Sequence, residues 1–103
     1  MLTRQLIEIT FNNAIAQANK LDDCADDMLR LANREIADIK NDIHMVWQGD
    51  SANSYMDKMT LTAGNIVTTA RKLKETARTI RNVANIFRNT ELRAIAIAEQ
   101  RTF

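Results

Sequence analysis

The residues that could carry out acid–base, nucleophilic or metal chemistry are few and widely separated. The chain has a single His, His44, and a single Cys, Cys24. On one long helix these two residues would lie about 30 Å apart, too far for a nucleophile and its base. The sequence has neither metal-ligand spacing nor a Gly-rich phosphate loop. We therefore expect no catalytic residues, no metal and no cofactor, and a protein that is not an enzyme.

The environments of these two residues are also predictable. Cys24 sits among periodic apolar positions, which favours a small buried side chain, and a lone cysteine forms no internal disulfide. His44 precedes a turn, where a cation suits a helix C-terminus. The N-terminal MLTRQLIEIT lacks the apolar core of a signal peptide, and no segment reaches transmembrane length. This pattern predicts no stable membrane insertion, and either a cytosolic protein or export that bypasses an N-terminal signal.

The elements that must position these residues are long helices. There is no Pro, and Gly occurs only at 49 and 64, so little interrupts a helix. Apolar residues alternate in steps of three and four from Ile7 to Val46, with one extra step of four from Ala32 to Ile36, a stutter. The pattern resumes from Ala52 to Ala98. It predicts one domain over 1–103: a helix over about 4–46, a turn at 47–50, a helix over about 51–90 and a tail at 91–103.

The turn contains the most unusual segment of the chain, HMVWQGDSANSY. Gly49 suits the chain reversal, and Asp50 or Ser51 suits the N-cap of the second helix. Trp47 has two interpretations: an end plug packed on Tyr55, or a half-exposed anchor for a partner. Gly64, inside the second helix, is a place where a neighbouring helix could approach closely.

The short turn predicts an antiparallel hairpin. The acidic cluster at 22–27 would then lie beside the basic residues at 71–78. Two helices cannot cover their own apolar stripes, so the fold class is all-α, with the hairpin dimerising into an elongated four-helix bundle of coiled-coil type. The partner is a second copy or a related hairpin, and the expected dimer interface consists of Phe11, Leu21, Met28, Ile66, Leu73 and Ile80.

The charge distribution argues against a nucleic-acid partner. The net charge of +1 divides into −3 for residues 1–49 and +4 for residues 50–103. The two halves suit pairing with each other, and neither is basic enough to indicate nucleic acid.

The turn segment resembles the signature of the WXG-hundred (early secreted antigen-like) family of small type VII secretion substrates. Trp47, Gly49, Ala52 and Tyr55 occupy its positions. The family's C-terminal signal is Tyr-x-x-x-Asp/Glu; here Phe87 and Glu91 stand there, with Phe in place of Tyr. The resemblance implies a virulence-associated protein, secreted after a cytoplasmic pool. Its export signal would combine Trp47 and Gly49 of one subunit with Phe87 and Glu91 of its partner, read by an FtsK-like ATPase.

Two other functions fit the same residues. The chain could be a targeting chaperone or heterodimer partner of a larger type VII toxin. It could also be a plain structural coiled-coil adaptor whose Trp47 closes the end of the hairpin. A nucleic-acid binder is a distant third alternative, because the balanced charge of the chain argues against it.

Overall fold

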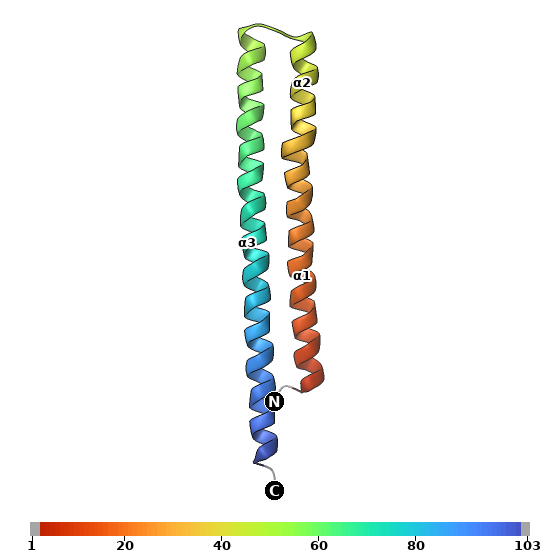
Figure 1. Cartoon of the computed structure of the whole chain (residues 1–103), viewed down its shortest axis with the longest axis vertical. Helices are drawn as coiled ribbons and strands as arrows, with labels where there is room; N and C mark the ends of the chain where they lie inside the picture. Colours follow the sequence, from red (N-terminus) through yellow and green to blue (C-terminus); the bar gives the residue numbers. More distant parts are fainter. Residues whose placement is uncertain (1–2, 102–103) are drawn as a thin grey trace. The chain divides into compact units, whose positions relative to one another are not determined.

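The computed structural model describes residues 3–101, and all of its regular structure is helical. Helix α1 spans Arg4–Arg30, the π-helix η1 spans Leu31–Glu35, α2 spans Ile36–Val46 and α3 spans Asp50–Gln100 (Figure 1). The predicted all-α class is confirmed, whereas α3 also takes in residues 91–100, which the sequence pattern left in a tail. None of these helices contains an apolar stretch long enough to cross a bilayer.

The chain divides into two compact units. Unit 1 combines the chain up to Leu21 with the chain from Glu75 onward, and unit 2 comprises Asp22–Lys74. Unit 1 therefore contains the start of α1 and the end of α3. Unit 2 contains the rest of α1, η1, α2, the turn and the start of α3.

The turn in unit 2 is built by three residues. Trp47 leaves the helix in an extended conformation, and its N–H donates to the Ile43 carbonyl at 2.8 Å. Gly49 follows with φ +116°, where a side chain would be strained. The Gly49 carbonyl accepts the Asn53 N–H at 3.0 Å, which starts α3. A reversal this tight makes α2 and α3 antiparallel neighbours.

Alanine dominates the buried core of both units. Unit 1 buries Ile7, Ala18, Ala77, Ala84 and Ile95, and unit 2 buries Ala25, Ala32, Ala52 and Ala70. Along α3, Ala70, Ala77 and Ala84 recur every seven residues, which places them on one side of the helix. Small side chains at the contact let helix backbones approach closely. As a result the larger apolar residues beside them are only half-buried.

Ion pairs link the two helices within each unit. In unit 1, Arg4 pairs with Glu99 at 2.7 Å and Arg88 with Glu8 at 2.8 Å. In unit 2, Lys74 pairs with Asp26 at 2.7 Å, an acid–base pairing that the hairpin prediction anticipated. Side chains this exposed contribute only about 0.2–1 kcal/mol per pair.

The π-helix lies where the sequence pattern has its extra step. On α1, half-buried Leu21 and Met28 are seven residues apart, and on α2 Ile36 and Ile43 are again seven apart. From Met28 to Ile36 the step is eight. A π-turn accommodates one additional residue within a helix. The residues Leu31–Glu35 thereby absorb the mismatch and keep the apolar side of α2 in line with that of α1.

Two sequence predictions about single residues are wrong. Cys24 is exposed, because it lies next to the half-buried line of α1 and not on it. A Cβ built on Gly64 would meet nothing within 4 Å, so none of the helices described in this chain makes a close approach there.

Candidate functional site

The most distinctive surface of the molecule is an apolar line along α3. Met59, Ile66, Leu73, Ile80 and Phe87 recur every seven residues, and each is half-buried. We call these five residues the α3 stripe. A seven-residue repeat keeps side chains on one side of a helix. The stripe lies beside the buried alanines, so its side chains extend past the helix contact to the surface.

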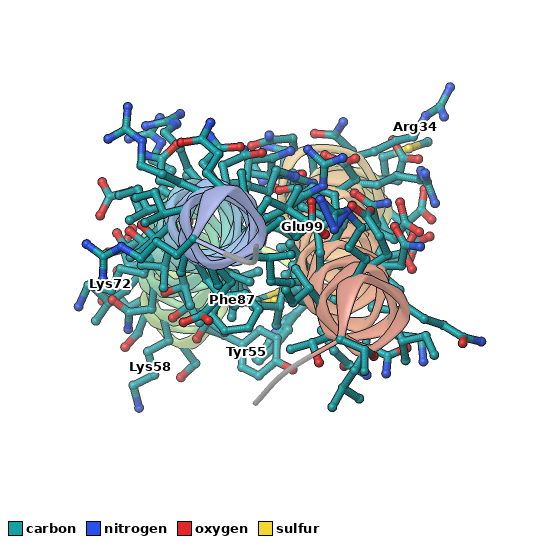
Figure 2. All side chains as sticks on the ribbon, turned by 90° about the horizontal axis from the view of Figure 1, so that it is seen from below. Arg34, Tyr55, Lys58, Lys72, Phe87 and Glu99 are labelled. Atoms are coloured by element: carbon teal, nitrogen blue, oxygen red, sulfur yellow. The ribbon has the colours of Figure 1, made fainter. Side chains whose placement is uncertain are left out.

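In unit 1 the stripe borders an open apolar hollow of about 360 Å³. Helix α1 contributes Phe11 and Ala14, and α3 contributes Ile80, Val83 and Phe87. Figure 2 shows Phe87 directed toward the space between the helices. The Arg88 guanidinium carbon lies 5.3 Å from the Phe11 ring centroid, a cation–π contact that holds this ring in place.

Unit 2 has a second hollow on the stripe, of about 280 Å³. It is lined by Ile36, Tyr55, Lys58, Met59 and Thr62. Tyr55 lies on the inner side of α3 and Lys58 points outward (Figure 2). Ile36 follows the π-helix directly.

A second line of exposed residues runs beside the stripe. We call it the threonine rim; it consists of Tyr55, Thr62, Thr69, Thr76, Val83 and Thr90. The Thr62 hydroxyl donates to the Lys58 carbonyl at 2.9 Å, and that of Thr69 to the Asn65 carbonyl at 3.0 Å. Because these hydroxyls are satisfied on their own helix, the two threonines offer methyl groups outward. The rim thereby widens the apolar surface.

All six residues predicted for a dimer interface are half-buried: Phe11, Leu21, Met28, Ile66, Leu73 and Ile80. They lie beside the alanine core, with an exposed edge available. Sequence reasoning did not assign Met59, Val83 or the threonine rim to this surface. The seven-residue spacing from Met59 to Phe87 is the sequence pattern from which the stripe could have been predicted.

The residues predicted for an export signal fall in different units. Trp47 and Gly49 belong to unit 2, and Phe87 and half-buried Glu91 belong to unit 1. Trp47 is 43% exposed, and its ring centroid lies 5.8 Å from that of Tyr55 with the planes tilted by 46°. The contact with Tyr55 is what the end-plug interpretation expects, and the exposure of the indole is what the half-exposed anchor expects.

No group of three or more His, Cys, Asp or Glu side chains gathers in a metal-binding arrangement anywhere in residues 3–101. The described residues do build an apolar surface, which is the α3 stripe with its two hollows.

Comparison with known families identifies the family of this chain. Residues 11–102 match the model of the DSHCT (NUC185) domain. The chain belongs to the DSHCT (NUC185) domain family. This domain is associated with RNA helicases. No curated protein and no solved structure gave a significant match.

The family match overturns the type VII secretion interpretation. The WXG-hundred assignment, the export function, the FtsK-like ATPase partner and the virulence association are therefore wrong. So is secretion, because the family points to RNA-processing proteins of the nucleus or cytoplasm. The physical reason is that Trp-x-Gly is a short turn motif. Gly49 serves the chain reversal and Trp47 contacts the Tyr55 ring, and a helical hairpin can use both features whatever its function.

The exclusion of nucleic acid also conflicts with an RNA helicase-associated family. That exclusion relied on charges averaged over halves of the sequence. Unit 1 instead has seven basic residues against four acidic ones, a net of +3, and unit 2 has seven against nine, a net of −2. Folding thus gathers positive charge in the unit that joins the two ends of the chain.

Proposed function

We propose that this chain is a non-enzymatic, self-associating helical module of RNA helicase assemblies. Its docking surface is the α3 stripe together with the adjacent half-buried residues of α1 and α2. The observation that carries the proposal is the inverted core. The most buried residues are mainly alanines, while large apolar side chains remain half-exposed.

The half-buried apolar side chains indicate a partner that buries a large apolar area. Completing the burial of one such side chain is worth about 1 kcal/mol, roughly half of a full Leu or Phe burial. Association costs an estimated 4–15 kcal/mol before any gain appears. Five side chains on one helix would barely offset that cost. The stripe needs a partner that offers a similar apolar surface in return.

A second copy of the chain meets that requirement, and the arrangement is a four-helix bundle. Each copy contributes nine large half-buried side chains: Phe11, Leu21, Met28, Ile36, Met59, Ile66, Leu73, Ile80 and Phe87. The net charges of +3 for unit 1 and −2 for unit 2 are complementary between copies. The half-buried apolar side chains, together with the opposite net charges of the two units, favour a second copy over an uncharged helix as the partner.

A second candidate function is direct contact with RNA phosphates. Unit 1 has exposed Lys20, Arg78, Arg93 and Arg101. Two of its four acids, Glu8 and Glu99, are paired with Arg88 and Arg4. The excess positive charge of this unit favours a backbone contact to RNA that depends on salt and not on sequence.

The docking surface is tested with two matched substitutions on α3. Ile80→Glu places a charge in the stripe, and Ile86→Glu makes the same change at a residue that is 65% exposed and outside it. Sedimentation equilibrium of the full chain should show a dimer for the wild type and Ile86→Glu, and a monomer for Ile80→Glu. A wild-type chain that stays monomeric at every concentration would contradict self-association.

The helicase association is tested with a purified RNA helicase encoded in the same genome. Its RNA-stimulated ATP hydrolysis is measured with and without the chain and the two variants. We expect the wild type and Ile86→Glu to change the rate, and Ile80→Glu to have no effect. ATP hydrolysis by the chain alone would contradict the non-enzymatic role. Fluorescence anisotropy with labelled single-stranded RNA tests the second candidate, with an Arg78→Ala, Arg93→Ala variant expected to weaken binding.

A further inference from the structure

We propose that the end of the α2–α3 hairpin docks in an apolar pocket rimmed by basic side chains on the associated RNA helicase. We call this end the hairpin tip; it consists of Met45, Val46 and Trp47, with the Tyr55 ring against Trp47. All four residues belong to unit 2. The inference rests on the helicase association proposed above, and it adds a contact surface separate from the α3 stripe.

The hairpin tip is the most exposed apolar part of the described chain. Met45 is 80% exposed and Val46 86%, more than any other large apolar residue within residues 3–101. Trp47 follows them directly, so the three residues form one patch. Single apolar residues are common on protein surfaces, whereas a contiguous exposed patch indicates an interaction site.

The same exposures decide between the two interpretations of Trp47. A plug at the end of a hairpin would shield the apolar residues next to it from water. Met45 and Val46 are instead left open, and the Trp47 ring rests on Tyr55, which is itself 48% exposed. The Trp47–Tyr55 pair is therefore part of the exposed surface, as an anchor for a partner requires.

The tip is ordered before a partner arrives. The Trp47 N–H donates to the Ile43 carbonyl at 2.8 Å, and the Asn53 N–H donates to the Gly49 carbonyl at 3.0 Å. These bonds hold the backbone on both sides of the turn, while the Tyr55 ring restrains the indole. A side chain that is already ordered loses less conformational entropy on binding, which raises the affinity that its contacts provide.

The apolar surface continues from the tip along α3. Tyr55 contacts Trp47 and also lines the unit 2 hollow of about 280 Å³, together with Met59. A partner that covers the tip can therefore place a side chain in this hollow. A hairpin end with a hollow beside it is complementary to the uneven surface of a folded protein, and not to a flat lipid surface.

The charges around the tip define the chemistry of the partner. Between Lys40 and Lys58 the chain contains three acids, Asp42, Asp50 and Asp57, and no Lys or Arg. With its single His neutral, this segment has a net charge of −3. All three acids are exposed, and none forms an ion pair within residues 3–101. Their carboxylates are available to a partner.

Two of these acids adjoin the apolar patch. Asp42 stands three residues before Met45 and four before Val46, spacings that place side chains beside each other on a helix. Asp50, the first residue of α3, stands three residues after Trp47. An apolar centre with a carboxylate rim is complementary to an apolar pocket with a Lys or Arg rim. The same rim repels phosphate groups, which disfavours RNA and anionic lipid as occupants.

An RNA helicase fits this description better than a protein without basic surfaces. A protein that binds RNA presents Lys and Arg to the phosphates, so basic side chains are concentrated on its surface. The carboxylates of the tip guide the approach to such a surface, and the apolar centre provides the affinity.

The test uses Trp47 as its own reporter, because it is the single tryptophan of the chain. The full chain is prepared with fluorinated tryptophan, and its fluorine NMR signal is recorded with and without a purified RNA helicase encoded in the same genome. The dissociation constant is measured by fluorescence anisotropy with a dye on Cys24, which is exposed and lies far from the tip in the sequence. We expect the helicase to shift the fluorine signal.

The apolar centre is tested by two variants and a control. Trp47→Ala removes the anchor, and the double variant Met45→Ser, Val46→Ser removes exposed apolar groups while it keeps the turn and the Trp47–Tyr55 contact. Leu61→Ser makes the same change at a residue that is 67% exposed and outside the tip. We expect the first two variants to weaken helicase binding at least about 30-fold, and Leu61→Ser to bind as the wild type does. Circular dichroism checks that each variant is folded.

The basic rim is tested by removing carboxylates. The double variant Asp42→Asn, Asp57→Asn should slow association severalfold at low salt and reduce its dependence on salt concentration. The control Asp23→Asn, Asp27→Asn removes two exposed acids of unit 2 that lie far from the tip in the sequence. We expect this control to associate as the wild type does. Equal salt dependence in both double variants would overturn the basic rim.

The remaining outcomes separate this inference from the proposed function. A folded Met45→Ser, Val46→Ser chain that binds the helicase with wild-type affinity would overturn docking by the tip, and the helicase association would still stand. No binding of the helicase by the wild type would contradict both. A fluorine signal that shifts only with phosphatidylcholine vesicles, or only with rising concentration of the chain alone, would assign the tip to a lipid surface or a second copy and overturn the helicase pocket.

Discussion

Removing one residue from the π-helix should leave the protein folded and about equally stable. Asn33 is an exposed residue of η1. Without it, Ile36 and Ile43 would stand seven and fourteen residues after Met28. The half-buried line from Ala14 through Leu21 and Met28 would then continue into α2 with a single spacing. We expect an unbroken α-helix in place of α1, η1 and α2, with every apolar contact kept.

The expected change in the free energy of unfolding is judged against a control deletion in α1. Deleting Lys20, an exposed residue inside α1, would rotate residues 4–19 by about 100° relative to the rest of the helix. That rotation would expose Ile7, which is fully buried, and would turn Phe11 away from its hollow. Full burial of Ile7 is worth about 1.5–3 kcal/mol and half-burial of Phe11 about 1 kcal/mol. The contacts of Ala18 are lost as well. We expect a loss of about 3–5 kcal/mol for this control.

The Asn33 deletion should by contrast change the free energy of unfolding by less than about 1 kcal/mol, since it removes an exposed side chain and one turn of irregular helix. Urea unfolding followed by circular dichroism measures both variants, at one fixed protein concentration because self-association adds to the apparent stability. An Asn33 deletion that costs as much as the Lys20 deletion would show that the π-helix does not compensate for the eight-residue step.

Three further substitutions test the turn, the helix and the core by the same unfolding measurement. Gly64→Ala should stabilise by about 0.5–1 kcal/mol, because alanine favours a helix and its Cβ meets nothing within 4 Å; a loss of stability would show a hidden close contact. Gly49→Ala should cost about 1–3 kcal/mol, because φ +116° strains any side chain; a neutral result would mean that the turn rearranges. Ala77→Leu should cost about 1–3 kcal/mol by overpacking a site that is 0% exposed, and an unchanged stability would show that the helix pair can separate to admit leucine.

Much of the local structure follows from the chain itself. Long runs without Pro, with apolar residues in steps of three and four, dictate helices. The pair Trp47 and Gly49 places the reversal, since glycine tolerates positive φ. The extra step from Ala32 to Ile36 also marks where the helix is irregular. A stutter in the pattern does not say whether an α-helix unwinds or a π-turn forms, and η1 shows the second outcome.

The function could not be obtained from the same residues. Trp-x-Gly in the middle of the chain predicted secretion. That prediction was wrong because a three-residue motif is easily shared by unrelated hairpins. The DSHCT (NUC185) match spans residues 11–102 and so depends on the pattern of both long helical segments. Likewise, charge counted along the sequence hid the positive unit 1, since that unit is assembled from the two ends of the chain.

The sequence by itself determined that the chain is helical, where it turns and which residues share its apolar sides. Only the tertiary structure decided which apolar residues form the core. Positions three apart, such as Ala70 and Leu73, lie in the same apolar sector, and periodicity cannot rank them. The packing of the helices does rank them. Alanines allow the helices to come close, and this close approach leaves the larger neighbours on the outside. The stripe centred on Leu73 is left half-buried for this reason.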